Sequence, residues 1–362
     1  MKHSARFLSC ALMFLLIALA MSIMSCSDSG SGGGGNSYFG TQSPGDVWSW
    51  TLNRDASGSG TFSATNSTTG ATYNGNVTTL TSKFLKLGVT ASSNSQAVGS
   101  TAYAIELLNT AVLVQPAGSN DSPVVAAAQG SCLPQGTSHY NWIKFPNQTW
   151  NPATDAAYGT ADIIVNGSTY GFSILQYLYT SAPITAFGNS STCSNGVISS
   201  PQPNSLFPTF GVTPSGVMIG DQGTNGGIVG MAQPSANIGS AAILQSGRQF
   251  RGFIFMPHPP NGQDKTNPVW SETRGDGLIR AGLYTNFANN VEDSCPGGDS
   301  CATLSLTAEV APGEFIGTMT DAHAGAHPFT MMVNQINGKY IVFCYSYNDV
   351  PANPYIVLLM EQ

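Results

Sequence analysis

Two carboxylates lie close together in the segment "SETRGDG", residues 271–277, beside a basic and an aromatic residue. Glu272 and Asp276 flank Arg274, and Trp270 comes directly before the segment. Many glycosidases use two carboxylates, one as the acid and the other as the base or nucleophile. Glu272 and Asp276 are therefore the candidate catalytic residues if the chain is a polysaccharide hydrolase, although the sequence does not give the distance between them.

A second cluster, "DAHAGAH" at residues 321–327, holds residue types that bind metal ions. Asp321, His323 and His327 offer one carboxylate and two imidazoles. On a helix the two histidines, four residues apart, would lie on one face. The Ala and Gly residues between them instead predict a turn between two strands. We therefore expect a solvent-exposed loop, and we predict no metal and no other cofactor for this chain.

Three tryptophans offer a binding chemistry that needs no catalytic group. If Trp142, Trp150 and Trp270 lie on exposed loops, their rings can stack on sugars; the alternative is that they cap the core. The sequence contains no nucleophile elbow, phosphate-binding loop, zinc-binding helix or haem-attachment motif. The absence of these motifs shifts the balance from catalysis toward binding or a structural role.

The N-terminal residues predict where the protein acts. Lys2 and Arg6 precede an apolar stretch, residues 7–23, which is too short and wrongly flanked for a membrane-spanning helix and is typical of a secretory signal. The stretch ends in "IMSC", residues 23–26, which resembles the lipobox of bacterial lipoproteins. The resemblance implies that Cys26 is acylated and attaches the protein to a membrane through its acyl chains.

A spacer is predicted after the lipobox. Residues 26–45 are rich in Gly and Ser near their start, a composition typical of flexible tethers. In lipoproteins an aspartate directly after the cysteine favours the inner membrane, whereas here that residue is Ser27, so the resemblance implies the outer membrane. We predict a lipoprotein signal peptide over residues 1–25, a flexible tether over 26–45 and a folded body over 46–362.

Export allows the remaining cysteines to form disulfides. In "CPGGDSC" a Pro-Gly-Gly turn separates Cys295 from Cys301, which predicts that these two pair. Cys132 and Cys193, both in loop-like sequence, are the second predicted pair. Cys344 lies in the apolar run "KYIVFCYSY" and is expected to be a buried strand residue. No Cys-x-x-Cys pair is present to indicate a metal site.

The charge of the chain excludes one class of partner. Only 9% of the residues are charged, against about 25% in an average soluble domain. Without Lys2 and Arg6, ten basic residues remain against 19 acidic ones, a formal charge of −9. Binding to nucleic acid requires clustered basic residues, and none of these ten forms a run, so we predict no nucleic-acid partner.

Short runs of β-branched and aromatic residues, bounded by Gly, Asn, Pro or Ser, recur along the body and predict strands. Asn166-Gly167 and Asn337-Gly338 each lie between two such runs, the usual signal of a tight hairpin. No convincing helix is present. We predict an all-β, multi-sheet antiparallel meander, with a propeller-like fold, a barrel and a double sandwich as open alternatives.

Three segments of the body share one plan. Residues 110–131, 215–235 and 338–361 each contain an apolar strand, a turn rich in Gly, Asn, Asp or Pro, and a second apolar strand. A Gly- and Thr-rich meander precedes each of them. We therefore predict that the body consists of about three degenerate meander units.

These observations favour a lipid-anchored cell-envelope protein that acts as a surface binding or scaffold module. Its predicted partners are the membrane, through the lipid on Cys26, and a glycan or an envelope protein. Two alternatives stay open: an extracellular polysaccharide hydrolase and a non-enzymatic component of an envelope assembly.

The predicted anchor can be tested directly. If Cys26 carries the acyl chains, a Cys26→Ser variant should move from the membrane fraction to the soluble fraction, because most of the apolar anchor is lost. Cell fractionation followed by immunoblotting measures this shift, and circular dichroism of the released protein checks that the fold is retained. Continued membrane association of the variant would place the anchor elsewhere.

Overall fold

The computed structural model of the 362-residue chain describes residues 36–42, 45–116, 122–145, 158–176, 184–188, 192–199, 209–212, 216–221, 227–257, 264–292, 301–321, 325–346 and 355–362. The predicted signal peptide and Cys26 lie outside these residues. In the described part of the chain, no helix has both the length and the apolar character needed to cross a membrane.

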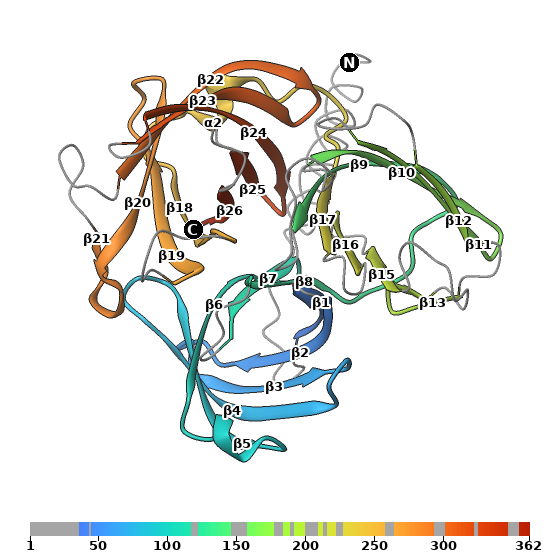
Figure 1. The fold of residues 1–362 in the computed structure, drawn as a ribbon, viewed down its shortest axis with the longest axis vertical. Helices are drawn as coiled ribbons and strands as arrows, with labels where there is room; N and C mark the ends of the chain where they lie inside the picture. Colours follow the sequence, from blue (N-terminus) through green and yellow to red (C-terminus); the bar gives the residue numbers. More distant parts are fainter. Residues whose placement is uncertain are drawn as a thin grey trace, which may run out of the picture. The chain divides into compact units, whose positions relative to one another are not determined.

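The fold is all-β and antiparallel, as predicted, and contains two closed eight-stranded barrels and one curled sheet (Figure 1). In the first barrel each strand pairs with the next along the chain, and β1 pairs with β8 to close the circle. Closure removes the free sheet edges. The strands of the first barrel are β1 (Asn36–Gln42), β2 (Asp46–Arg54), β3 (Gly60–Asn66), β4 (Ala71–Thr79), β5 (Leu85–Ser92), β6 (Thr101–Leu107), β7 (Ala111–Gln115) and β8 (Val124–Ala128).

Strand β1 corrects the predicted tether, because it lies within residues 26–45. Tyr38 is fully buried and Phe39 nearly so, so the folded body begins before residue 46. Gly40, which contributes to the Gly-rich composition of this region, has a packing role. A Cβ atom at this position would lie 2.5 Å from the carbonyl oxygen of Val125 on β8, so the close approach of β1 and β8 requires glycine.

The middle of the chain forms a nine-stranded sheet in the order β12-β11-β10-β9-β17-β16-β15-β14-β13. Its edge strands β12 and β13 are separated by only three residues in sequence, so their ends are at most roughly 14 Å apart and the sheet must curl. The strands are β9 (Gly136–Phe145), β10 (Tyr158–Asn166), β11 (Thr169–Gln176), β12 (Ile184–Gly188), β13 (Thr192–Ser194), β14 (Val197–Ser199), β15 (Thr209–Val212), β16 (Val217–Asp221) and β17 (Gly227–Ala232).

The last part of the chain forms the second barrel, which closes through the pairing of β19 with β20. A short strand, β21 (Val291–Glu292), pairs with the end of β20, and a one-turn helix, α2 (Ser240–Ile243), precedes the barrel. The eight barrel strands are β18 (Gln249–Phe255), β19 (Thr266–Thr273), β20 (Leu278–Asn286), β22 (Cys301–Ala311), β23 (Glu314–Asp321), β24 (Gly325–Ile336), β25 (Lys339–Ser346) and β26 (Tyr355–Glu361).

Both hairpins predicted from Asn-Gly pairs are present. Asn166-Gly167 lies at the turn between β10 and β11, and Asn337-Gly338 lies at the turn between β24 and β25. Asn337 and Gly338 both have positive φ, 51° and 78°. Two consecutive residues with positive φ match the right-handed twist of the adjoining strands, which explains the preference for this pair.

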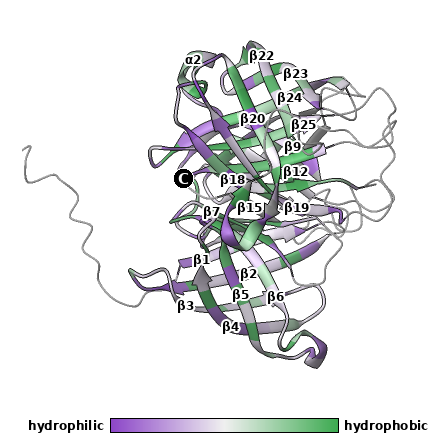
Figure 2. Ribbon diagram, turned by 90° about the vertical axis from the view of Figure 1, so that its left-hand side faces the viewer, coloured by the Kyte–Doolittle hydropathy of each residue, from purple (hydrophilic) through white to green (hydrophobic). Residues whose placement is uncertain are grey.

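Burial alternates along β3 and β4 of the first barrel, as expected for strands with one face toward the barrel interior and the other toward solvent. In β3 and β4 the buried positions alternate with more exposed ones, and hydropathy varies along these strands (Figure 2). Three hairpins depart from this pattern: β7–β8, β16–β17 and β25–β26 are buried on both faces. They coincide with the three segments that share one plan in the sequence.

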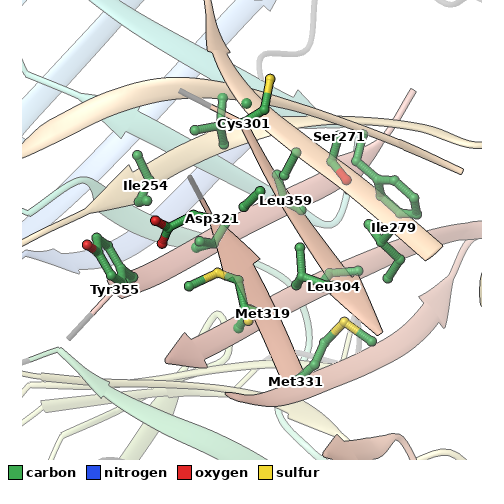
Figure 3. A pocket seen from close by; sticks show the side chains of 18 of the residues that line it. Ile254, Ser271, Ile279, Cys301, Leu304, Met319, Asp321, Met331, Tyr355 and Leu359 are labelled. Carbon is green, nitrogen blue, oxygen red and sulfur yellow. The ribbon is translucent and has the colours of Figure 1, made fainter. Parts of the chain in front are cut away.

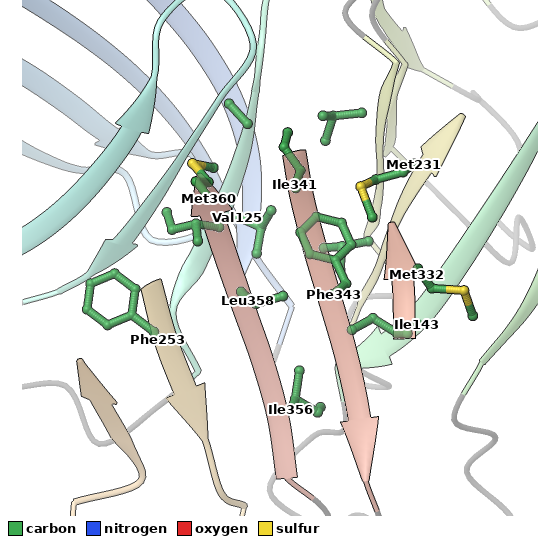
Figure 4. Close-up of a cluster of buried hydrophobic side chains, with 14 of the residues drawn as sticks. Val125, Ile143, Met231, Phe253, Met332, Ile341, Phe343, Ile356, Leu358 and Met360 are labelled. Carbon is green, nitrogen blue, oxygen red and sulfur yellow. The ribbon is translucent and has the colours of Figure 1, made fainter. Parts of the chain in front are cut away.

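These three hairpins meet in one apolar cluster, which we call the central core (Figure 4). Alternate residues of each hairpin enter the central core, and those between them pack inside the hairpin's own sheet. The other members of the central core are Phe84, Ile105, Ile143, Phe253, Phe255, Met332 and Ile336. The hairpin residues of the central core are Ala111, Leu113, Val125, Ala127, Val217, Ile219, Val229, Met231, Ile341, Phe343, Tyr345, Ile356, Leu358 and Met360.

Truncation of a central-core side chain should be costly. Leu358 is fully buried, so Leu358→Ala should lower the free energy of unfolding by about 2–5 kcal/mol through lost burial and the cavity left behind. Urea unfolding followed by tryptophan fluorescence measures the change. Leu108→Ala is the matched control, because Leu108 is 53% exposed and its truncation should cost no more than about 0.5 kcal/mol. Equal effects of the two variants would contradict the placement of Leu358 in the central core.

Candidate functional site

The interior of the second barrel contains a partly open cavity of about 600 Å³ (Figure 3). Aliphatic, methionine and small side chains from all eight strands form most of its wall, and Ile243 of α2 also contributes. Ile254, Leu304, Met319 and Leu359 are among the apolar residues around it. Volumes of this size are typical of small-molecule sites, and a barrel of eight strands holds either its own side chains or one small ligand.

The space exists because small side chains lie opposite one another on neighbouring strands. Ser271 on β19 pairs with Ala281 on β20, Ala281 pairs with Ala302 on β22, and Ala302 pairs with Asp321 on β23. Directly opposed residues share one face of an antiparallel sheet, and all four line the cavity. This small-residue row crosses four strands, and the methyl and hydroxyl groups within it are too short to fill the interior.

The first barrel has the same strand number but a different filling. Trp48, Trp50 and Phe62 belong to its interior cluster. The rings of Trp48 and Trp50 stack with centroids 5.5 Å apart, and those of Trp50 and Phe62 lie 6.2 Å apart. Large rings therefore occupy space in the first barrel that the small-residue row leaves open in the second.

Polar groups lie at two places in the cavity wall. Asp321 and Tyr355 lie together at one side, and Ser271 lies at the opposite side (Figure 3). Burial, and secondarily the nearby Asp321 carboxylate, raise the pKa of the Tyr355 phenol, so Tyr355 keeps its proton at neutral pH and can donate a hydrogen bond. The hydroxyl of Ser271 is buried and has no hydrogen-bond partner.

The described part of the cavity wall carries an acidic group and no basic one. Among the described residues that line it, none is Lys, Arg or His, and Asp321 is the one carboxylate. Burial raises the pKa of the Cys344 thiol to about 12, so this group is neutral at physiological pH. An apolar interior with one carboxylate in its wall is suited to bind an apolar molecule and unsuited to bind an anion.

The two candidate catalytic carboxylates lie outside the cavity wall and are each paired with arginine. Glu272 binds Arg274 at 2.6 Å, and Asp276 binds Arg280 at 2.5 Å; Arg280 also attracts Glu272. The hydrogen bond from Arg280 holds the pKa of Asp276 below its usual range, which disfavours Asp276 as a proton donor. Their proposed role in a hydrolase stays a prediction.

The sugar-stacking interpretation is wrong for two of the three tryptophans. Trp142 lies within β9 and Trp270 within β19, and each is only 2% exposed. Their indole N–H groups donate to the carbonyl oxygens of Thr160 and Leu283, both at 2.9 Å. Buried rings with satisfied N–H groups are core residues. Trp150 lies outside the described residues.

The predicted solvent-exposed loop around "DAHAGAH" is wrong for His327. Asp321 ends β23, whereas His327 is inside β24, opposite Met319, and is only 4% exposed. Its two ring nitrogens have no hydrogen-bond partner. His323 lies outside the described residues. Within the described ranges, no three His, Cys, Asp or Glu side chains are grouped so that they could hold a metal ion.

Cysteine pairing agrees with the sequence where the structure describes it. Cys132 and Cys193 form the predicted disulfide, with their Cα atoms 6.1 Å apart, and it ties β13 to the segment before β9. Cys301 is disulfide-bonded; Cys295, its predicted partner, lies outside the described residues. Cys344 is free and buried in β25, as predicted, and it lines the cavity.

No protein-family model matches the chain, and no curated protein sequence matches it significantly. Among solved structures, isotype 1 transferrin binding protein B from serogroup B Neisseria meningitidis is 11% identical, with a TM-score of 0.31, over 88% of this chain and 66% of that chain. A mutant of transferrin binding protein B from Haemophilus parasuis is 8% identical, with a TM-score of 0.26, over 88% and 66%. The chain therefore has a distant structural similarity to transferrin binding protein B.

The burial of Cys344 predicts a low reactivity. At pH 9 native Cys344 should react with iodoacetamide about a hundredfold or more slowly than in the urea-unfolded chain, because the thiolate is the nucleophile and burial suppresses it. Peptide mass spectrometry of timed samples measures the labelling. The Cys344→Ser variant identifies the peptide signal that belongs to this residue, and rapid labelling of Cys344 in the native protein would contradict its placement in a buried strand.

Proposed function

We propose that this protein is a lipid-anchored cell-envelope binding protein whose second barrel holds a small apolar ligand. The single observation that carries the proposal is the cavity of about 600 Å³ inside a closed eight-stranded barrel. Placement in the envelope rests on the resemblance of residues 23–26 to a lipobox, and the preference for the outer membrane rests on Ser27 in place of an aspartate. Neither the anchor nor the ligand requires a catalytic residue.

Two features of the cavity support a ligand site. Its wall is apolar and contains few polar groups, as in typical small-molecule pockets. In addition, the buried hydroxyl of Ser271 has no hydrogen-bond partner, and an unsatisfied buried group of this kind costs about 1–3 kcal/mol. A ligand with a polar atom near Ser271 would remove this cost.

Recognition of a glycan or of an envelope protein was the more specific hypothesis from the sequence. Its aromatic support is reduced to Trp150, since Trp142 and Trp270 are core residues. The cavity favours a ligand that is enclosed and apolar over one that is flat and sugar-like.

Cavity filling tests the proposal. Unacylated full-length Cys26→Ser protein should bind the apolar dye N-phenyl-1-naphthylamine saturably at a ratio of one to one. Ala302→Trp, introduced into this protein, should weaken binding at least tenfold, because the indole occupies the cavity next to the small-residue row. Fluorescence titration measures both affinities.

Ala308→Trp is the matched control, since Ala308 lies on the same strand, β22, but is exposed. This variant should bind the dye as tightly as the Cys26→Ser parent. Ala281→Leu fills less space and should weaken binding even if Ala302→Trp does not fold. An absence of saturable dye binding by the parent protein, or full affinity in a folded cavity-filled variant, would overturn the proposal.

A further inference from the structure

We infer, on the basis of the proposed function, that the ligand is an amphiphile whose head group donates hydrogen bonds, an amine or a hydroxyl group, and that Asp321 and Tyr355 bind this head group. The ligand class therefore excludes free fatty acids and other apolar anions.

The charge of the wall supports a donor head group. Asp321 is the one carboxylate among the described lining residues, and none of them is Lys, Arg or His to neutralise an anionic head group. In an apolar surrounding the carboxylate repels a second negative charge and attracts a cation or a hydrogen-bond donor more strongly than it would in water. The carboxylate itself offers only acceptor oxygens.

Tyr355 complements this chemistry. Its ring lies beside Asp321 at the same side of the cavity (Figure 3), and it comes from β26, whereas Asp321 comes from β23. The phenol can accept one hydrogen bond and donate another. An amine or a hydroxyl can therefore contact both residues at once: an ammonium donates one N–H to Asp321 and another to the phenol oxygen, whereas a hydroxyl donates its O–H to Asp321 and accepts from the phenol.

The small-residue row provides room for an apolar body that starts at this head group. From Asp321 it passes Ala302 and Ala281 to Ser271, and at the usual strand spacing these four positions extend about 14 Å along the wall. An alkyl chain of about a dozen carbons has a similar extended length. The row thus connects the head-group end at Asp321, through the apolar stretch of Ala302 and Ala281, with the unpartnered hydroxyl of Ser271 at the far end, where a second polar atom of the ligand would bind.

Three ligands with the same chain and different head groups test the inference. Dodecylamine, dodecanol and dodecanoate are titrated, below their aggregation concentrations, against the full-length Cys26→Ser protein loaded with N-phenyl-1-naphthylamine. The amine and the alcohol should displace the dye at concentrations at least tenfold lower than dodecanoate. Introducing Asp321→Asn into this protein should reduce the ratio of the dodecanoate and dodecylamine concentrations needed to displace the dye about tenfold, because the variant removes the charge and keeps the size of the side chain.

Asp162→Asn, a matched charge removal on β10 of the curled sheet, should leave the ranking unchanged. If the parent protein binds the dye but dodecanoate displaces it as well as the amine does, the head-group inference is wrong and the proposed function stands. The same holds if folded Asp321→Asn protein keeps the full preference for the amine. An absence of dye binding by the Cys26→Ser parent overturns the proposed function and the head-group assignment with it. If Asp321→Asn does not fold, the ranking of the three ligands on the parent protein decides.

Discussion

Burial of three hairpins on both faces is the constraint on which the rest of the structure depends. Phe343 of β25 and Leu358 of β26 enter the central core. The next residue on each strand, Cys344 and Leu359, faces the interior of the second barrel. Packing on the outer face therefore holds these strands in place independently of what fills the barrel. For this reason the second barrel can keep its shape around a cavity that would otherwise favour collapse.

The two barrels show how filling, rather than strand number, decides what a barrel can do. Both close with eight antiparallel strands, yet the first contains stacked Trp48 and Trp50, and the second has Ala281 and Ala302 at opposed positions. A bulky ring fills the barrel interior and makes packing contacts there, whereas a methyl group leaves space in which a ligand can make those contacts. The difference lies in a few side chains that face the interior of each barrel.

The sequence was sufficient for the fold class, the Cys132–Cys193 disulfide and the Asn-Gly hairpins, because those signals are local or compositional. It was insufficient for the cavity, since Ser271, Ala281, Ala302 and Asp321 become neighbours only through strand register, which depends on the whole barrel. The tryptophans were undecided for a related reason. The sequence left an exposed loop and the core as alternatives for Trp142, and only its position inside the curled sheet makes the ring a core residue.

Anchoring and an apolar cavity are physically complementary under the proposed function. An amphiphile with a chain of a dozen carbons partitions strongly into a bilayer, at about 0.8 kcal/mol for each methylene group. Its concentration in the surrounding water is therefore low, and a binding protein free in solution would meet it rarely. A protein held at the membrane surface through Cys26 stays where the ligand accumulates. The acidic wall at Asp321 then separates amines and alcohols from the anionic lipids that share that surface, which a purely apolar cavity could not do.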